Sequence, residues 1–192
     1  MTIDRINRIF DESVKVISET KNLSKEIQKV ADVIIDCYKS DNKVVIFGNG
    51  GSAADAQHLA AEFIGRFKLD RQSLPALALT TDTSIITALG NDYSFDNIFA
   101  RQCESMVHKG DVVIAISTSG KSKNVLNGIT ASRKKGAFVI GLTGVNGIHL
   151  QKMVDLLLIV PSTSTARIQE GHRLIIHAIC ELVEESFKKI KN

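Results

Sequence analysis

The chain of 192 residues is 44% hydrophobic and 23% charged, with a formal net charge of +3. These values are typical of a globular protein, and the length is sufficient for a full hydrophobic core. The positive charges form no stripe interleaved with aromatic residues, and tryptophan is absent, which argues against a nucleic-acid partner. We therefore expect one domain over residues 1–192, divided into a helical arm at 1–40 and an α/β core at 41–192.

The cysteines and the apolar runs indicate the cellular compartment of the protein. Cys37, Cys103 and Cys180 are odd in number and scattered, with no pair at zinc-finger spacing, so we expect reduced thiols. The first residues contain acids and no apolar segment typical of a signal peptide, and no apolar run approaches the roughly 20 residues that span a membrane. We expect a cytoplasmic protein with no membrane partner.

Residues 1–40 carry two helical patterns ahead of any strand. Their recurring apolar residues are Ile6, Ile9, Phe10, Val14 and Ile17 in the first, and Leu23, Ile27, Val30 and Ile34 in the second. Because no strand precedes these helices, we expect them to pack on the sheet or to form a surface for a partner subunit.

From Lys43 onward, short apolar runs alternate with helical patterns. The expected strands are 43–47, 75–79, 111–116, 137–142 and 155–160. The expected helices are 52–65, 83–90, 94–108, 121–135, a short one at 147–153 and a long one at about 165–190. Continuous apolar strands separated by helices predict a parallel sheet in a three-layer α/β/α sandwich. Ligands of such sheets bind at the carboxyl ends of the strands.

Two of these strands end in loops suited to an anion. One loop reads Gly48-Asn49-Gly50-Gly51-Ser52, and the other reads Ser117-Thr118-Ser119-Gly120-Lys121-Ser122. Each precedes a helical pattern, and the N-terminus of a helix offers unpaired N–H groups and a positive dipole end to a phosphate. Two such loops on strands of one parallel sheet predict a phosphorylated small-molecule ligand.

The helical pattern at 52–65 carries three polar side chains on one face, because Asp55, His58 and Glu62 are spaced i, i+3 and i+7. A histidine and a glutamate one turn apart can share a divalent metal or act as an acid and base pair. A solvated face with a chance pairing is the alternative. The position just after a phosphate-type loop favours the functional interpretation.

The C-terminal helical pattern places Gln169, Arg173 and His177 on one side. His177 lies among isoleucines, and a histidine on such a helix is more often a satisfied core residue than a catalyst. If it is buried it needs a polar partner, which a carboxylate or a metal on the 52–65 helix could supply.

Three shorter features have ordinary structural explanations. Gly90 is expected to end a helix, with Asn91-Asp92 in the turn that follows. His108 and His149 read as residues of surface turns.

Taken together, these motifs resemble a known family. The matching segments are Gly48–Ser52, Asp55-Ala56-Gln57-His58, Glu62, Gly65-Arg66, Gly90-Asn91-Asp92, Ser117–Ser122 and Ala166-Arg167-Ile168-Gln169-Glu170. They closely resemble the phosphoheptose isomerase family of the sugar-isomerase (SIS) domain group, over nearly all of residues 40–187. Gly171 departs from the family, which usually has a larger apolar residue there. Because glycine costs about 1 kcal/mol inside a helix, we expect the helix to begin later or to bend at this position.

The resemblance implies a fold, an assembly and an activity. It implies a five-stranded parallel sheet of flavodoxin-like type, and a homotetramer with active sites at subunit interfaces. It implies conversion of sedoheptulose 7-phosphate to D-glycero-D-manno-heptose 7-phosphate, the first step towards nucleotide-activated heptose for lipopolysaccharide or other surface glycans.

The resemblance also implies residue roles. The substrate contacts would be Asn49, Gly50, Gly51, Ser52, Glu62, Arg66, Asn91, Asp92, Ser117, Thr118, Ser119, Ser122 and Gln169. The ligands of one Zn²⁺ per subunit would be His58, Glu62, Gln169 and His177, with Glu62 and His177 also the catalytic pair.

The expected chemistry fits these residues but leaves two questions open. Moving a proton between neighbouring carbons through an enediolate needs a base, for which Glu62 is suited, and an acid, for which His177 is suited. A carboxylate bound to zinc is a weaker base. Either Glu62 therefore leaves the metal to act as the base, or the metal is mainly structural. Gln169 and His177 lie about 12 Å apart along a straight helix, so either Gln169 precedes the regular helix or the site combines groups from more than one chain.

Two binding proteins of the same group are the alternatives. One is a non-enzymatic relative that binds the replication initiator DnaA, which lacks the acid and the imidazole found here at Glu62 and His177. The other is a sugar-binding regulatory domain, usually fused to a DNA-binding segment, for which residues 1–40 show no basic helix-turn-helix.

Overall fold

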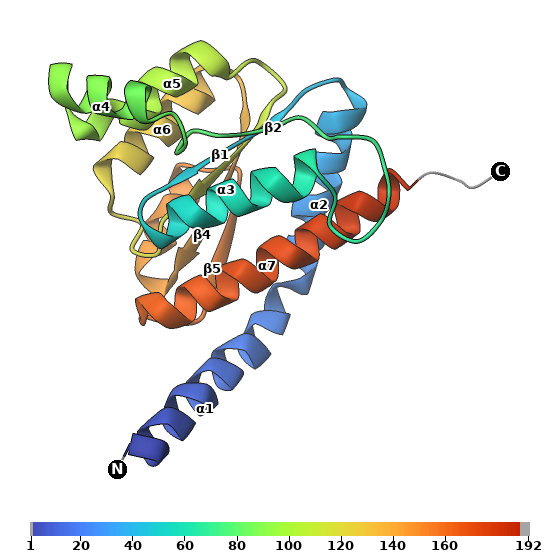
Figure 1. The fold of residues 1–192 in the computed structure, drawn as a ribbon, viewed down its shortest axis with the longest axis vertical. Coiled ribbons are helices and arrows are strands. Elements are labelled where there is room, and N and C mark those ends of the chain that lie inside the picture. The colour runs from blue at the N-terminus through green and yellow to red at the C-terminus, as the bar shows by residue number, and fades with distance from the viewer. Residues whose placement is uncertain (1, 189–192) are drawn as a thin grey trace.

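The computed structural model describes residues 2–188 and contains a five-stranded parallel sheet covered by helices on both faces (Figure 1). The strand order is β2-β1-β3-β4-β5. The strands are β1 (Val44–Gly48), β2 (Ala76–Ala78), β3 (Val112–Ile116), β4 (Phe138–Gly144) and β5 (Leu156–Val160). The predicted α/β/α sandwich with a five-stranded parallel sheet is confirmed.

The helices comprise a projecting arm, α1, and two layers that cover the sheet. They are α1 (Thr2–Thr20), α2 (Ser24–Lys39), α3 (Gly51–Ile64), α4 (Thr83–Asp92), α5 (Ile98–Met106), α6 (Lys123–Lys134) and α7 (Thr165–Ser186), with short 3₁₀ segments at Lys21–Leu23, Phe95–Asn97 and Val145–Lys152. One core joins α2, α3 and α7 to one face of the sheet, and the other joins α5 and α6 to the opposite face.

β1 shows why the strands read as continuous apolar runs. Val44 and Ile46 belong to the core under α2, α3 and α7, whereas Val45 and Phe47 belong to the core under α5 and α6. All five residues of the strand are buried, because successive side chains point to opposite faces and both faces are covered.

The pairing of β1 brings the two predicted loops together. β1 pairs with β2 on one side and with β3 on the other. The order in which strands are added to the sheet therefore reverses between β1 and β3. The last pair of the β1–β3 register is Gly48 with Ile116. The two loops therefore leave the same edge of the sheet side by side, at the switch point where such folds bind ligands.

Several predicted element boundaries differ from the structure. α4 continues through Gly90 to Asp92, so the predicted helix end at Gly90 is wrong. The segment 145–152 is a 3₁₀ helix, and α7 ends at Ser186, whereas it was expected to reach about 190. Residues 189 and 190 lie outside the described part of the chain, as do Met1 and the last two residues of the predicted domain.

Gly171 lies inside α7, which begins at Thr165, so the expected later start of this helix is wrong. A Cβ at position 171 would lie 2.7 Å from Cγ1 of Val160 on β5. The glycine therefore allows a close approach of α7 to the sheet, which offsets its low helix propensity.

α1 extends away from the body of the protein (Figure 1). Its attachments to α7 include a hydrogen bond from Ser13 Oγ to Glu170 Oε2 at 2.6 Å and one from Arg167 Nη1 to the Ile9 carbonyl at 2.7 Å. Apolar side chains on this helix remain exposed, namely Ile3, Ile6, Ile9, Phe10 and Val14. Within residues 2–188 no helix is long and apolar enough to cross a membrane.

His172 on α7 makes folding stability depend on pH. Its side chain is fully buried, and burial lowers the pKa of His172 from 6.5 to about 4. Between these values the unfolded chain binds a proton that the folded chain does not bind. The stability that comes from the neutral imidazole is therefore complete above about pH 6.5 and is lost as the pH falls towards 4.

We predict that the wild-type chain loses about 2 kcal/mol more unfolding free energy between pH 7 and pH 5 than His172→Leu does. Urea denaturation of both proteins at the two pH values measures this difference. Equal losses in the two proteins would contradict the prediction.

Candidate functional site

A cavity of about 260 Å³ opens at the carboxyl ends of β1 and β3. Its walls are Asn49, Gly50, Gly51, Ser52, Ile116, Ser117, Thr118, Ser122, Thr165 and Gln169. Eight of these ten residues were predicted from the sequence as substrate contacts; Ile116 and Thr165 were not. The N-termini of α3 and α6 both border it, so backbone N–H groups and hydroxyls meet where an anion would bind.

Glycines shape the first loop. Gly50 has a φ of +56°, a conformation that side chains disfavour, and it turns the chain from β1 into α3. A Cβ at Gly51 would collide with the side-chain amide of Gln169. Glycine at position 51 thus lets α7 place Gln169 on the cavity wall.

Side chains fix the second loop in its turn. Gly120, with a φ of +67°, donates its N–H to Ser117 Oγ at 3.1 Å. His149 Nε2 donates to the Gly120 carbonyl at 2.9 Å. His149 was expected to be an ordinary surface turn residue; in the structure it holds this loop in place.

An asparagine pair joins the first loop to the start of α6, directly after the second loop. Asn49 Nδ2 donates to Asn124 Oδ1 at 2.8 Å, and Asn124 Nδ2 donates to Asn49 Oδ1 at 2.9 Å. Asn124 Oδ1 also accepts the N–H of Val125. Asn124 was not among the predicted site residues, because an asparagine near the start of a helix usually caps its own backbone.

Five predicted substrate contacts do not line this cavity. One is Glu62, which belongs to the cluster described below. Ser119 is exposed, and its Oγ accepts the N–H of Lys121 at 3.2 Å. Asn91 and Asp92 are exposed at the end of α4, and Arg66 is exposed just after α3. Within one chain, therefore, these side chains do not share the wall formed by the two loops.

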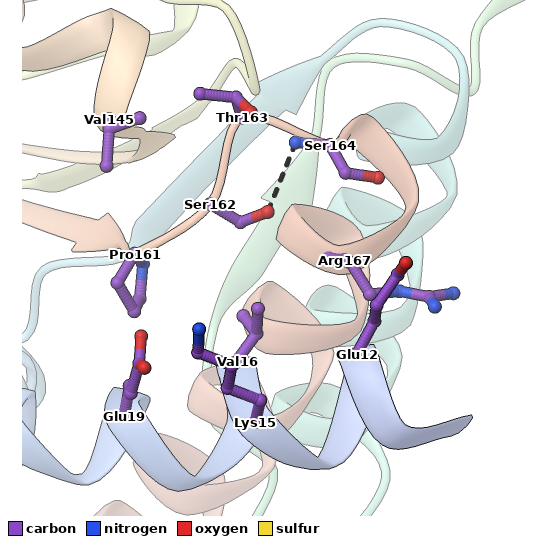
Figure 2. A pocket seen from close by; sticks show the side chains of 10 residues that line it. All are labelled: Glu12, Lys15, Val16, Glu19, Val145, Pro161, Ser162, Thr163, Ser164 and Arg167. Atoms are coloured by element: carbon purple, nitrogen blue, oxygen red, sulfur yellow. Dashed lines mark hydrogen bonds between the residues drawn. The ribbon is translucent and has the colours of Figure 1, made fainter. Parts of the chain in front are cut away.

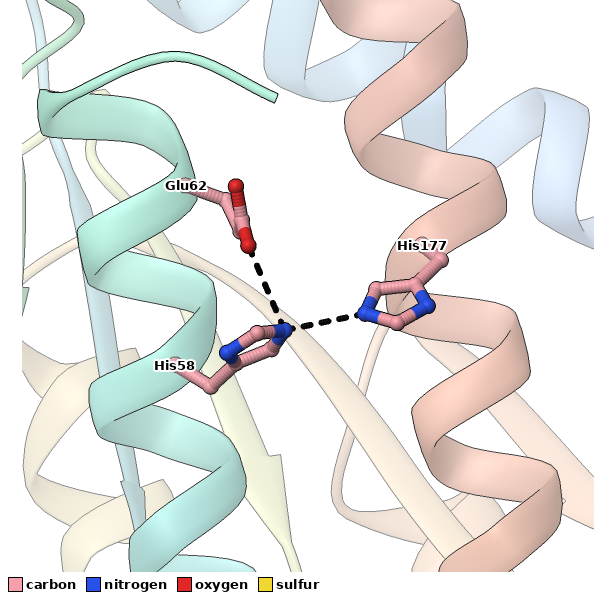
Figure 3. A group of neighbouring side chains, drawn as sticks. All are labelled: His58, Glu62 and His177. Carbon is pink, nitrogen blue, oxygen red and sulfur yellow. Dashed lines mark hydrogen bonds and ion pairs between the residues drawn. The ribbon is translucent and has the colours of Figure 1, made fainter. Parts of the chain in front are cut away.

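A second cluster lies farther along α3 and α7 (Figure 3). His58 Nε2 lies 2.9 Å from His177 Nε2 and 3.4 Å from Glu62 Oε1. Ligand atoms of all three residues lie within 4.8 Å of one another. The polar partner of His177 is thus the imidazole of His58, where a carboxylate or a metal was expected. Glu62 and His177 meet within a single chain.

The surroundings of His58 favour its neutral imidazole. Burial lowers the pKa of His58, and the positive charge of Arg173 lowers it further, while Glu62 opposes this effect. Two ring nitrogens 2.9 Å apart are stable only when one carries a proton and the other accepts it. A neutral imidazole is also the form that binds a metal ion.

Arg173 and Asp55 join the two helices next to this cluster. Arg173 Nη2 lies 2.6 Å from Asp55 Oδ1, whose side chain is 5% exposed. Burial raises the pKa of Asp55, and the charge of Arg173 counteracts the shift. Asp55 was predicted on the same helix face as His58 and Glu62, and its role here is to position α3 against α7.

The donor set of His58, Glu62 and His177 fits a zinc ion. Two imidazole nitrogens and a carboxylate oxygen are common zinc ligands, and tetrahedral zinc with bonds of about 2.0–2.2 Å separates its ligand atoms by roughly 3.3 Å. The separations of 2.9 and 3.4 Å are close to this value. Gln169, the predicted fourth ligand, lies inside α7 and contacts position 51 at the phosphate-type cavity.

Another cavity, of about 410 Å³, lies between α1 and the segment joining β5 to α7 (Figure 2). Its charged wall residues are Glu12, Lys15, Glu19 and Arg167. Because acids and bases are mixed there and none of the predicted site residues takes part, we assign no ligand to it.

Comparisons with known proteins agree with this arrangement. The family model described as SIS domain matches residues 9–144. The phosphoheptose isomerase of Sulfurimonas denitrificans is 50% identical over 182 residues, which are 95% of this chain and 93% of that protein. The structure of phosphoheptose isomerase from Neisseria gonorrhoeae has a TM-score of 0.91 and 42% identity, covering 96% of this chain and all of that one. The structure from Francisella tularensis has a TM-score of 0.93 and 38% identity, covering 96% and 99%.

The two serines of the second loop should differ in anion binding. We predict that Ser122→Ala weakens the binding of inorganic phosphate by about tenfold, because it removes a hydroxyl donor to a charged ligand. Ser119→Ala should leave the affinity unchanged, because Ser119 does not line the cavity. Isothermal titration calorimetry with phosphate measures both, and equal weakening would place the anion elsewhere.

Proposed function

The chain belongs to the phosphoheptose isomerases of the SIS domain family, and we propose that it converts sedoheptulose 7-phosphate to D-glycero-D-manno-heptose 7-phosphate. The product would supply nucleotide-activated heptose for lipopolysaccharide or another surface glycan. The three free cysteines are buried and suit a reducing compartment, so we propose a cytoplasmic location.

The observation that carries this proposal is the spacing between the phosphate-type cavity and the acid–base cluster. Ser52 borders the cavity and His58 belongs to the cluster, and six residues of α3 separate them by about 9 Å. An extended heptose 7-phosphate spans a comparable length between its phosphate and its carbonyl end. The phosphate would therefore be bound at one end while the reacting carbons lie beside Glu62 and His177.

The proposed reaction uses Glu62 as the base and His177 as the acid. Glu62 removes a proton from the carbon next to the carbonyl and returns it to the neighbouring carbon, while His177 moves a proton between the two oxygens. A zinc ion held by His58, Glu62 and His177 would supply positive charge beside those oxygens. Gln169 of the same chain lies at the phosphate-type cavity, about two turns before His177 on α7, so as a fourth ligand it would come from a neighbouring chain. The DnaA-binding alternative gives no role to a paired carboxylate and imidazole.

We predict that Glu62→Gln lowers kcat for sedoheptulose 7-phosphate by about 100- to 10,000-fold, because the amide cannot act as a base. The fold, followed by circular dichroism, should remain. Glu104→Gln, at an exposed site on α5, serves as the control with wild-type turnover. Near wild-type kcat in Glu62→Gln would remove Glu62 from the mechanism.

We also propose a homotetramer with active sites at subunit interfaces. Ile3, Ile6, Phe10 and Val14 repeat at intervals of three and four along α1 and are all exposed, which is typical of a helix that packs against another copy. Arg66, Asn91 and Asp92 do not line the cavity of their own chain, and an interface would let them reach the site of a neighbour.

Replacing this apolar stripe should weaken the assembly. We predict that Phe10→Asp combined with Val14→Asp yields a smaller oligomer, because burying two carboxylates in an apolar contact is unfavourable. Size-exclusion chromatography with light scattering measures the mass, and Asp11→Ala, on an exposed polar position of the same helix, is the control. A tetrameric mass for the double variant would exclude the stripe from the interface.

A further inference from the structure

Glu184, near the end of α7, makes an unusual set of contacts with the loop after α3. Its side chain is 2% exposed. Its carboxylate accepts the backbone N–H groups of Phe67 at 2.8 Å, Lys68 at 2.6 Å and Leu69 at 2.7 Å. Three charge-assisted hydrogen bonds on successive amides fix the course of this loop.

Arg71 links the same carboxylate to the end of α3. Its Nε lies 3.4 Å from Glu184 Oε1. Its Nη2 donates to the carbonyl of Glu62 at 2.7 Å, and its Nη1 donates to the carbonyl of Phe63 at 2.8 Å. The last carbonyls of a helix have no partner within the helix, so Arg71 satisfies them and holds the turn that carries Glu62.

The loop held by Glu184 also contacts the other catalytic candidate. The ring of Phe67 lies against the ring of His177, with centroids 5.4 Å apart and planes at 33°. The amide of Phe67 is the first of the three that Glu184 binds. One buried ion pair therefore contacts the backbone at Glu62 and, through Phe67, the imidazole of His177.

We propose that Glu184, together with Arg71, is a positioning residue for the Glu62–His177 pair. The inference rests on the proposed function, since it assigns that pair its chemistry. Glu184 touches neither the substrate cavity nor the cluster, and it acts through the loop 67–69 and through Arg71. The two residues together bind the backbone at Glu62 and at Phe67, the segments next to the reacting side chains.

The first test separates binding from turnover. Glu184→Gln replaces one acceptor oxygen by an N–H₂ group, so the three amides can no longer all be bound. A displacement of about 1 Å can cost about 100-fold in rate, so we expect kcat to fall by roughly 10- to 100-fold while KM stays within about threefold.

Glu181→Gln is the matched control. Glu181 lies on the same helix and contacts the same loop, through an ion pair with Lys68 Nζ at 2.7 Å. The two side chains are 47% and 56% exposed, and exposed pairs contribute little. Wild-type kcat is expected for this variant, and a loss equal to that of Glu184→Gln would overturn the proposal.

The second test does not depend on turnover. The ring of Phe67 shifts the NMR signals of the His177 ring protons, and Phe67→Leu provides the signal positions without this effect. Glu184→Gln should move the His177 signals towards those of Phe67→Leu at one fixed pH, whereas Glu181→Gln should not. Unchanged His177 signals in folded Glu184→Gln would overturn the proposal.

The tests also separate this inference from the proposed function. If the wild type does not convert sedoheptulose 7-phosphate, the proposed function fails, and the NMR signals still decide whether Glu184 positions His177. If Glu184→Gln does not fold, Phe67→Leu decides, because it leaves Glu184 and its backbone contacts in place. We expect its kcat to fall about tenfold or more with KM unchanged, and wild-type kcat in this variant would overturn the proposal.

Discussion

The packing of α3 against α7 is the constraint on which the rest of the site depends. Near the start of α3, Gly51 admits the side chain of Gln169, so the two helices meet at the phosphate-type cavity. Further along, Asp55 and Arg173 form an ion pair between the helices, and His58 contacts His177. The separation between anion cavity and acid–base cluster is therefore set by the rise of two helices that run side by side, and both are rigid elements.

The sheet contributes the second half of this geometry. Because β1 and β3 are neighbours in register, their loops leave the same edge of the sheet. The Asn49–Asn124 pair holds the first loop against the start of α6, which follows the second loop. α3 and α6 begin directly after these loops, so both direct their positive dipole ends at one point. Binding a phosphate there requires little reorganisation, since the N–H groups are already oriented by the helices that follow.

The features that could be predicted from the sequence depend on the spacing of residues that are close together in the chain. The apolar runs located all five strands, the two small-residue loops located the anion cavity, and the spacing of His58 and Glu62 located their shared helix face. Contacts between segments that are far apart in the sequence have no local pattern from which they could be predicted. Asn124 and Glu184 act on loops far away in sequence, and neither residue type at its position departs from an ordinary capping or solvated residue. Gly171 misled the prediction because tertiary packing overrides helix propensity. Among the described residues nothing packs against Gly90, and α4 simply continues two residues past it.

Glu184 and Glu62 show how the environment gives the same type of side chain two different roles. Burial alone would raise the pKa of Glu184, but hydrogen bonds from Lys68, Leu69 and Phe67 and the charge of Arg71 lower it, so this carboxylate is a fixed anion. Glu62 is 19% exposed and lies 3.4 Å from an imidazole nitrogen, so its carboxylate is accessible and is not held in a buried network. Glu62 also lies two residues before the end of α3, where helices fray. A reactive group at a fraying end needs external support, which explains why a buried ion pair is kept there although its desolvation is costly.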